Sequence, residues 1–446
     1  MNTHRDTIFA LSSPVGKSAL SVVRVSGEKS IWVAEKLTKN KFKTFKHRSA
    51  YLSNIYSINN NLIDKAVLVF YKSPHSYTGE NLFEITVHGN PIIVDVLFET
   101  LTNLGLRLAN PGEFTSRAYH NKKIDLVQAE STLSVINAKS KKGVRSSLLG
   151  VAGKLSDKLE ETKKLLVLSL SELEYELDIS EVDNSNLVIK RAQNNIKKTI
   201  TKMEKLIKTH HKSCILTDGA RIAIVGPPNV GKSTLLNSLI EKEKAIVTDV
   251  PGTTRDTIES FTYFSNFPVV LIDTAGIRQT TDKIERIGIK RTKDEIKSSD
   301  IIFNIQPNTA TKTNATDPHK TINVINKSDL MTTKEKKTLQ KRNPSFVIVS
   351  AKNKKGLNRL KSKTIGLLKT KTDSTEPFYL SSKRQQKALI QSKKHLKVAL
   401  KKENIYELEI VAQNIRMALS EFDWVLGKTT SDDILNSVFS DFCVGK

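Results

Sequence analysis

One segment of the chain, Gly226-Pro-Pro-Asn-Val-Gly-Lys-Ser233, restricts the possible fold more than any other. It fits the pattern G-x-x-x-x-G-K-S, with an apolar run at 221–225 before it and a helical pattern at 234–240 after it. The two glycines let such a loop curl, so that backbone N–H groups point inward at phosphate oxygens. The lysine places a positive charge near the β- and γ-phosphates, and the serine hydroxyl is a ligand for Mg²⁺. The segment therefore predicts a nucleoside triphosphate site at a strand-to-helix turn.

Three further segments follow predicted strands in the order expected of a GTPase. The carboxylate of Asp273 reaches Mg²⁺ through water, and the N–H of Gly276 meets the γ-phosphate. Asp329 accepts two hydrogen bonds from guanine, which adenine does not offer, so the site selects GTP over ATP. Ser350-Ala-Lys352 covers the base. The nucleotide-binding residues predicted so far are Asn229, Val230, Gly231, Lys232, Ser233, Thr234, Asp273, Thr274, Ala275, Gly276, Asn326, Lys327, Asp329, Ser350, Ala351 and Lys352.

The catalytic side of this site departs from many GTPases. Ile277 stands where relatives of this class often carry a glutamine that orients the attacking water. Isoleucine cannot do this, so hydrolysis takes its water-orienting group and its extra positive charge from elsewhere. The loop 245–256 is the predicted switch, with Thr254 as a second Mg²⁺ ligand. Together with Asn229, this loop is suited to hold a monovalent cation that supplies the missing charge.

The rest of the chain divides around this module. Residues 217–372 alternate helices with short apolar strands, expected at 221–225, 268–272, 301–305, 321–325 and 345–349, as in a sheet covered on both faces. Residues 1–118 indicate a small α+β domain, with strands near 19–25, 65–71 and 83–88 and a helix at 92–104. Residues 119–216 and 373–446 are predicted to be all-helical, because their apolar residues recur three and four apart. The fold class is α/β multidomain, with one module inserted into a helical domain.

The charge of the chain is strongly basic. Lys and Arg number 71 against 46 Asp and Glu, a formal net charge of +25. This excess favours a polyanionic partner, with RNA ahead of DNA or a membrane surface. A lysine-rich coding bias that decorates solvated faces is the alternative. Runs at 190–212, 352–371 and 383–402 carry much of the charge.

Cysteine usage and hydropathy indicate the compartment. Cys214 and Cys443 are too few for a disulfide framework or a cysteine-based zinc site. No apolar run is long enough to cross a membrane, and no leader pattern begins the chain. We therefore expect a cytoplasmic protein with no membrane association.

Motifs outside the nucleotide site carry a resemblance over essentially the whole chain. The sequence resembles the MnmE (TrmE) family of bacterial tRNA modification GTPases, in the TrmE-Era-EngA-YihA-Septin-like superfamily. The motifs are Arg24-Val-Ser-Gly27, Tyr77-Thr-Gly-Glu80, Asn110-Pro-Gly-Glu-Phe114, Asn121-Lys-Lys-Ile-Asp-Leu-Val-Gln-Ala-Glu130, Gly252-Thr-Thr-Arg-Asp256, Arg286-Ile-Gly288 and Phe442-Cys-Val-Gly-Lys446.

This resemblance implies a homodimer built through an N-terminal folate-binding domain, with a helical domain and an inserted Ras-like P-loop GTPase domain. Such proteins work with the flavoprotein MnmG in a heterotetramer-type complex. They add an aminomethyl or carboxymethylaminomethyl group at C5 of the wobble uridine of certain tRNAs. The one-carbon unit comes from 5-formyl-tetrahydrofolate or a related folate, and K⁺ stimulates GTP hydrolysis.

The resemblance also implies site residues. By position, Asn229 and Thr248 are side-chain ligands of K⁺, with the backbone carbonyls of Val250 and Thr253 completing the shell. The family's water-orienting glutamate corresponds to Glu285. The switch segment that meets the nucleotide is Thr248, Asp249, Val250, Pro251, Gly252, Thr253 and Thr254.

The implied folate site consists of Arg24, Glu80, Lys123 and Lys446, and Cys443 stands where the family has a cysteine linked to the modification. A carboxylate suits the N–H donors of a pterin, and cations suit the glutamate tail of folate. Three departures from the family stand out: Asn90 in place of a glycine, Val444 in place of isoleucine, and Gln306-Pro-Asn308 in place of a segment with an aspartate.

Two other functions stay open at this point. The chain is alternatively a GTP-gated RNA-binding or ribosome-assembly factor, in which the basic runs hold RNA. A folate enzyme with a vestigial GTPase is the third hypothesis.

Overall fold

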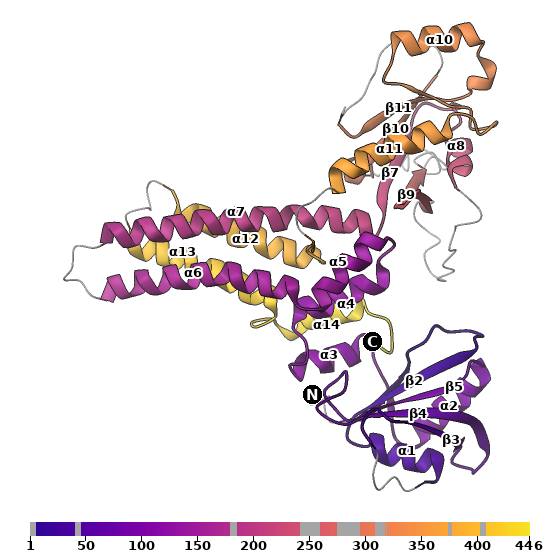
Figure 1. Ribbon diagram of the computed structural model, residues 1–446, viewed down its shortest axis with the longest axis vertical. Helices are drawn as coiled ribbons and strands as arrows, with labels where there is room; N and C mark the ends of the chain where they lie inside the picture. Colours follow the sequence, from indigo (N-terminus) through magenta and orange to yellow (C-terminus); the bar gives the residue numbers. More distant parts are fainter. Residues whose placement is uncertain are drawn as a thin grey trace, which may run out of the picture. The chain divides into compact units, whose positions relative to one another are not determined.

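The computed structural model describes residues 6–40, 46–178, 185–240, 259–273, 295–307, 317, 319–372, 377–401 and 407–446. Two compact units account for the chain, and they are described separately. One unit combines Met1–Leu133, Ser156–Thr199 and Lys387–Lys446, and the other combines Ser134–Leu155 with Ile200–Gln386. Figure 1 colours the elements by their place in the sequence. The three-domain division at 118, 217 and 372 stays a prediction.

The first unit begins with a six-stranded sheet in the order β3-β4-β5-β2-β1-β6. Side chains alternate across β2, so Val23 and Val25 lie on one face with Arg24 and Ser26 on the other. Helices α1 and α2 bury the valine face, and α3 packs against the other through Phe114. The strands are β1 (Ile8–Leu11), β2 (Leu20–Ser26), β3 (Ala50–Tyr56), β4 (Leu62–Tyr71), β5 (Leu82–His88) and β6 (Arg107–Leu108), and the helices are α1 (Ser30–Thr38), α2 (Pro91–Asn103) and α3 (Glu113–His120).

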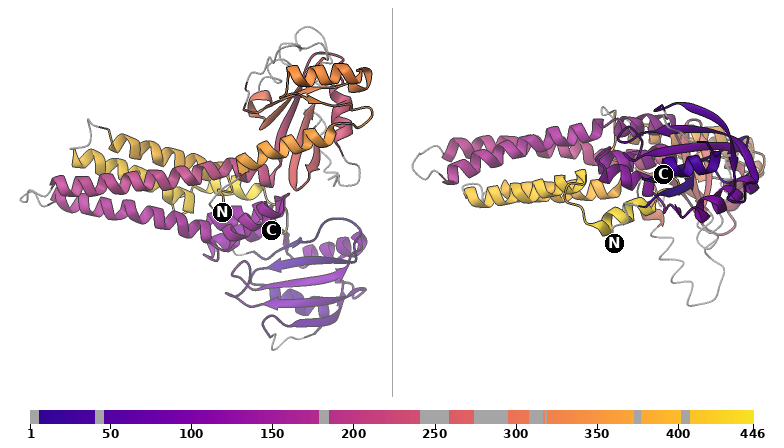
Figure 2. Two further views of the ribbon diagram at one scale, coloured as in Figure 1. Left: turned by 45° about the horizontal axis from the view of Figure 1, so that its top comes forward. Right: turned by 90° about the horizontal axis from the view of Figure 1, so that it is seen from below.

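The described helical part of the chain includes the long helices α6, α7, α12 and α13, which lie side by side (Figures 1 and 2). In the first unit, Asn195 of α7 donates to Ser169 of α6, and Ser392 of α12 donates to the backbone of α13. These contacts make a bundle. The helices are α4 (Leu126–Asn137), α5 (Lys141–Val151), α6 (Lys154–Asp178), α7 (Ser185–Thr217), α12 (Lys383–Ala399), α13 (Leu408–Leu426) and α14 (Asp432–Ser440).

The second unit contains a six-stranded sheet in the order β12-β11-β10-β7-β9-β8. Its strands are parallel except β8, which pairs antiparallel with β9. Apolar side chains of α8 and α11 pack on the sheet in one core cluster. The strands are β7 (Ala220–Val225), β8 (Glu259–Phe264), β9 (Phe267–Asp273), β10 (Ile301–Gln306), β11 (Thr321–Ile325) and β12 (Val347–Ile348), and the helices are α8 (Lys232–Leu239), η3 (Ser328–Leu330), α10 (Thr333–Arg342) and α11 (Leu357–Thr372).

The architecture confirms the predicted fold class, with two corrections inside the second sheet. Strand β8 had no counterpart in the prediction, and β12 covers only Val347–Ile348 instead of 345–349. None of the helices in the described ranges combines the length and the apolar character of a membrane span.

One departure from the family has a structural explanation. Asn90 caps the N-terminus of α2, where its side chain accepts a hydrogen bond from the N–H of Ile92 at 3.0 Å. Its φ is −104°, in the extended region that any residue adopts. The position therefore does not require glycine, and asparagine contributes a cap there.

Candidate functional site

The phosphate loop lies at the carboxyl end of β7, a strand flanked by β9 and β10 inside the second sheet. The chain leaves β7 at Val225 and enters α8 at Lys232, so the loop occupies the N-terminal end of a helix. Gly226 and Gly231 have φ of +153° and +88°, conformations that favour glycine. A Cβ at Gly231 would also lie 2.5 Å from Nδ2 of Asn326. The loop geometry thus requires both glycines of the motif.

The charged and hydroxyl groups of the loop lie beside Asp273, at the end of β9. Ser233 donates a hydrogen bond from Oγ to Oδ2 of Asp273 at 2.8 Å. These two oxygens are hard ligands of the kind that Mg²⁺ prefers, so the residues present fit the ion. Nζ of Lys232 donates to the carbonyls of Gly226 and Pro227 at 3.1 and 2.8 Å. The ammonium therefore lies at the phosphate loop itself.

The segment predicted to recognise the base is joined to the phosphate loop by hydrogen bonds. Nδ2 of the buried Asn326 donates to the carbonyls of Val230 and Gly231 at 3.1 and 3.2 Å. Its Oδ1 accepts the N–H of Ala351 at 3.0 Å. Nζ of Lys327 donates to the carbonyl of Asn229 at 2.6 Å. One asparagine thus ties together three segments that are far apart in the sequence.

Asp329 lies exposed next to this junction. Ser350 donates a hydrogen bond from its hydroxyl to Oδ1 of Asp329 at 2.5 Å. That bond, more than any other group, lowers the pKa of the Asp329 carboxyl. The carboxylate is therefore ionised at neutral pH, which is the form that the predicted pairing with the two N–H donors of guanine requires. Thr234 and Lys352 are exposed beside the same loops.

Several predicted nucleotide and cation residues lie outside the described residues. The structure thus leaves the K⁺ ligand set and the water-orienting group as predictions. These residues are Thr248, Asp249, Val250, Pro251, Gly252, Thr253, Thr254, Thr274, Ala275, Gly276 and Glu285.

A second polar cluster lies in the first unit, where the C-terminal tail meets the sheet. Nη1 of Arg24 on β2 donates to the carbonyl of Gly445 at 3.2 Å, and the hydroxyl of Ser12 donates to the same oxygen at 3.3 Å. Nη2 of Arg24 pairs with Glu84 at 2.8 Å. Burial and the nearby Arg24 cation lower the pKa of Lys446. The structure therefore brings Arg24 and Lys446 together from opposite ends of the chain.

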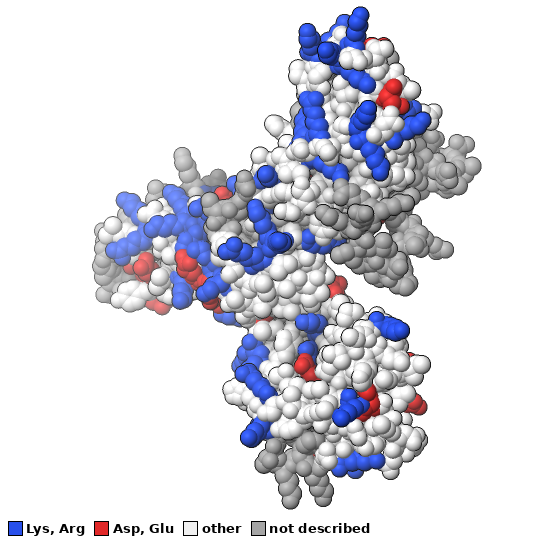
Figure 3. Space-filling view, turned by 45° about the vertical axis from the view of Figure 1, so that its right-hand side comes forward, with Lys and Arg blue, Asp and Glu red and all other residues white. Residues whose placement is uncertain are grey.

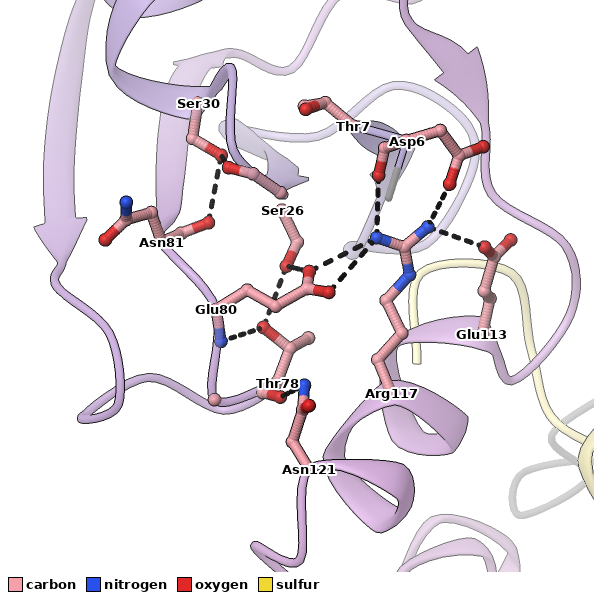
Figure 4. Close-up of polar contacts among 12 residues, drawn as sticks. Asp6, Thr7, Ser26, Ser30, Thr78, Glu80, Asn81, Glu113, Arg117 and Asn121 are labelled. Atoms are coloured by element: carbon pink, nitrogen blue, oxygen red, sulfur yellow. Dashed lines mark hydrogen bonds and ion pairs between the residues drawn. The ribbon is translucent and has the colours of Figure 1, made fainter. Parts of the chain in front are cut away.

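Glu80 belongs to a network of polar groups in the same unit (Figure 4). Ser26 donates to Oε2 of Glu80 at 2.7 Å. Nη1 of Arg117 lies 3.2 Å from the same oxygen. Arg117 is 1% exposed and also pairs with Asp6 and Glu113, at 2.6 and 2.9 Å. The carboxylate of Glu80 is thereby held in one orientation.

Lys123, predicted for the folate site, and Cys443, predicted to take part in the modification, are both exposed. Nζ of Lys123 donates to the carbonyl of Pro74 at 2.9 Å, and Lys123 is exposed. Cys443 is an exposed free cysteine whose carbonyl accepts a hydrogen bond from Gly112 at 3.5 Å. Its backbone thus anchors the tail, while its side chain is accessible.

The sequence interpretation missed the residues that hold this cluster together. Ser26 and Glu113 stand inside motifs that carried the family resemblance, so motif membership was the available signal. Arg117 and Glu84 stand outside those motifs. The cation–π contacts of Arg24 were also not predicted: its guanidinium lies 5.6 Å from the ring centre of Tyr77 and 5.7 Å from that of Phe114.

Comparison with known families supplies the deciding observation. Residues 126–443 match the family described as the MnmE helical domain, and residues 7–123 match the N-terminus of the GTP-binding protein TrmE. The tRNA modification GTPase MnmE of Fervidobacterium nodosum is 38% identical over 457 residues, covering 100% of this chain and 98% of that protein. The chain belongs to the MnmE family. The MnmE of Aquifex aeolicus is 35% identical over 453 residues, covering 99% of this chain and 100% of that protein. Family membership makes the chain a GTP hydrolase.

Solved structures give weaker likenesses. Era from Aquifex aeolicus, bound to GDP and AlF₄⁻, matches with a TM-score of 0.25 and 25% identity, over 41% of this chain and 68% of that one. The G domain of the FeoB iron transporter from T. maritima matches with a TM-score of 0.23 and 22% identity, over 33% of this chain and 98% of that one.

Proposed function

We propose that this chain is a K⁺-stimulated GTPase that modifies C5 of the wobble uridine of certain tRNAs in the cytoplasm. It acts as a homodimer with the flavoprotein MnmG and uses a one-carbon unit from a tetrahydrofolate such as 5-formyl-tetrahydrofolate. Two polar sites carry the proposal, one for the nucleotide and one for the folate.

At the nucleotide site, the bond between the γ-phosphorus and the β–γ bridging oxygen breaks, and a water oxygen bonds to phosphorus. GDP leaves with the electron pair, and the water proton passes to phosphate. Lys232 would stabilise the charge on the phosphates, and Ser233 with Asp273 would hold Mg²⁺, which would neutralise part of that charge. Glu285 is proposed to orient the water.

The extra positive charge that hydrolysis needs next to the phosphates is assigned to K⁺. Asn229, Thr248, Val250 and Thr253 would hold it. Asn229 has a left-handed backbone, φ +62°, and Lys327 holds its carbonyl at 2.6 Å. These constraints fix the position of the residue that is proposed to place the cation next to the phosphates.

The folate site is assigned to Arg24, Glu80, Lys123 and Lys446, with Cys443 next to it. The assignment rests on the position of the C-terminal tail. Arg24 donates a hydrogen bond to the carbonyl of Gly445, so the neighbouring Lys446 lies near Arg24 on the sheet. A pterin presents N–H donors that a fixed carboxylate such as Glu80 accepts, while Arg24 and Lys446 supply charges for a carboxylate tail.

Calorimetric titration of the full chain with 5-formyl-tetrahydrofolate tests the assignment. We expect binding by the wild type and a loss of affinity of about 10-fold or more in Arg24→Gln. Lys36→Gln, a change of a cation on α1, is the matched control and keeps wild-type affinity. Equal affinity in the Arg24 variant, or no binding by the wild type, would refute the folate site.

A further inference from the structure

The helical bundle of the first unit has two helices whose exposed faces carry several cations and no acidic side chain. Ile189 and Ile196 of α7, and Leu389 and Leu396 of α12, are buried and mark the inner faces of these helices. The opposite faces carry exposed cations at helical spacing. We call these cations the basic face; they are Lys190, Arg191 and Lys198 of α7 and Lys387, Lys394 and Lys397 of α12.

Charge is segregated among the four helices. No Asp or Glu occurs in α7 from 185 to 199 or in α12 from 387 to 399. In contrast, α6 carries Asp157, Glu160, Glu161, Glu172, Glu174, Glu176 and Asp178, and α13 carries Glu409, Glu421 and Asp423. Figure 3 shows Lys and Arg spread over the visible face of the bundle, with smaller patches of Asp and Glu among them.

Some of the acidic side chains of α6 and α13 form ion pairs between these two helices. Lys163 of α6 pairs with Asp423 of α13, and Arg416 of α13 pairs with Glu174 of α6 at 2.8 Å. A lysine-rich coding bias would place excess cations on all four helices. Their concentration on α7 and α12 instead indicates a surface for a polyanion.

We infer that the basic face binds the phosphate backbone of a tRNA stem. The inference rests on the proposed function, which makes tRNA the substrate, and adds the surface that holds it. A helix rises 1.5 Å per residue, so Lys387 to Lys397 extends roughly 15 Å. A nucleic-acid duplex carries a phosphate about every 3.4 Å along each strand, so this length meets several phosphates.

The residue types on the face determine what it recognises. Lysine is a flexible point charge that suits phosphates rather than base edges. Helix α12 contains no Phe, Tyr or Trp for stacking unpaired bases, and neither does α7. Proteins that read single-stranded RNA depend on such rings. The face therefore holds a double-helical stem without reading its sequence, and the choice of tRNA is made elsewhere.

A fluorescence-anisotropy titration tests the surface with the full chain and an unmodified tRNA transcript, at several KCl concentrations. The test variant combines K198Q, K387Q, K394Q and K397Q. The matched control combines K334Q, K336Q, K337Q and K341Q, four lysines of α10 in the other unit. Both variants lose the same charge, and we expect both to keep the wild-type GTPase rate without tRNA.

We expect the test variant to bind tRNA about 10-fold more weakly, or worse, at 0.1 M KCl. The slope of log affinity against log salt becomes shallower by about one for each phosphate that the variant no longer neutralises. The control keeps the wild-type affinity and slope. A second transcript with the same fold and different stem sequences binds as well as the first.

Equal loss of affinity in the two variants would overturn the inference, because net charge alone would then explain binding. Unchanged tRNA affinity in the test variant, together with weaker binding of MnmG, would assign the face to a protein partner and overturn it too. In either case, a strain that carries the test variant in place of the wild-type chain and still modifies its wobble uridines would leave the proposed function standing. The proposed function itself fails only if a strain that lacks the gene keeps that modification.

Discussion

Nη1 of Arg117 lies 3.2 Å from one carboxylate oxygen of Glu80 and 3.4 Å from the other, so one buried nitrogen faces the whole carboxylate. Arg117 reaches Glu80 from α3, and the same guanidinium pairs with Asp6 and Glu113. A buried cation thus holds in place a residue that we assign to the folate.

The first prediction concerns the stability that this cation provides. Arg117→Gln leaves the carboxylates of Glu80 and Glu113 without their buried partner, which costs about 3 kcal/mol of unfolding free energy. Arg416→Gln, at an ion pair whose side chains are 55% and 41% exposed, costs less than about 1 kcal/mol. Denaturant unfolding followed by circular dichroism measures both values, and equal costs would contradict a structural role for Arg117.

The second prediction concerns acid. Burial alone would raise the pKa of Glu113, but hydrogen bonds from Arg107, Asn110 and Arg117 lower it below its ordinary value near 4.5. A depressed carboxyl pKa contributes stability above the unfolded-state pKa and loses it as the pH falls through the folded-state pKa. The melting temperature should therefore fall as the pH drops below about 4.5. Glu113→Gln should melt lower at neutral pH and show a flatter acid dependence; a wild-type acid dependence in this variant would contradict the account.

The third prediction concerns the base. In Asp329→Asn, an amide N–H₂ faces the N–H donors of guanine, so GTP affinity falls by about 100-fold or more. Xanthosine triphosphate has a carbonyl oxygen in place of the C2 amino group of guanine, and this oxygen can accept a hydrogen bond from the amide. It should therefore bind the variant better than GTP does. Titration of the two nucleotides measures the switch, and GTP affinity equal to that of the wild type would refute the assigned base pocket.

The fourth prediction concerns the monovalent cation. GTP hydrolysis should be faster in K⁺ than in Na⁺, and Asn229→Ala should lower the rate in K⁺ by about 100-fold, toward the rate in Na⁺. Asn358→Ala, at an exposed asparagine of α11, serves as the control. Equal wild-type rates in the two salts would remove K⁺ from the mechanism.

The sequence was sufficient to predict the central strands and the loop between β7 and α8. Strand β7 is almost continuously apolar because both of its faces are covered, and that run stands out in any window. The phosphate loop depends on local spacing, which is visible without tertiary structure. Strand β8 lies at the sheet edge, where Ser260 and Thr262 dilute the apolar pattern, and the prediction omitted it.

The cluster around Arg117 was beyond prediction for a physical reason. A single arginine on a short helix is usually exposed. Of its partners, Glu113 lies one turn away on the same helix, but Asp6 and Glu80 are 111 and 37 residues away in the sequence. The return of the tail to Arg24 bridges 421 residues with no local signal. Only the packing of the domain brings these groups together.

Mass spectrometry of tRNA nucleosides from a strain that lacks the gene tests the central claim most directly. The account predicts that the C5 modification of wobble uridines disappears in that strain. Expression of the wild-type chain should restore it, and Lys232→Ala, which cannot stabilise the phosphates, should not. A nucleoside profile unaltered by the deletion would contradict the account.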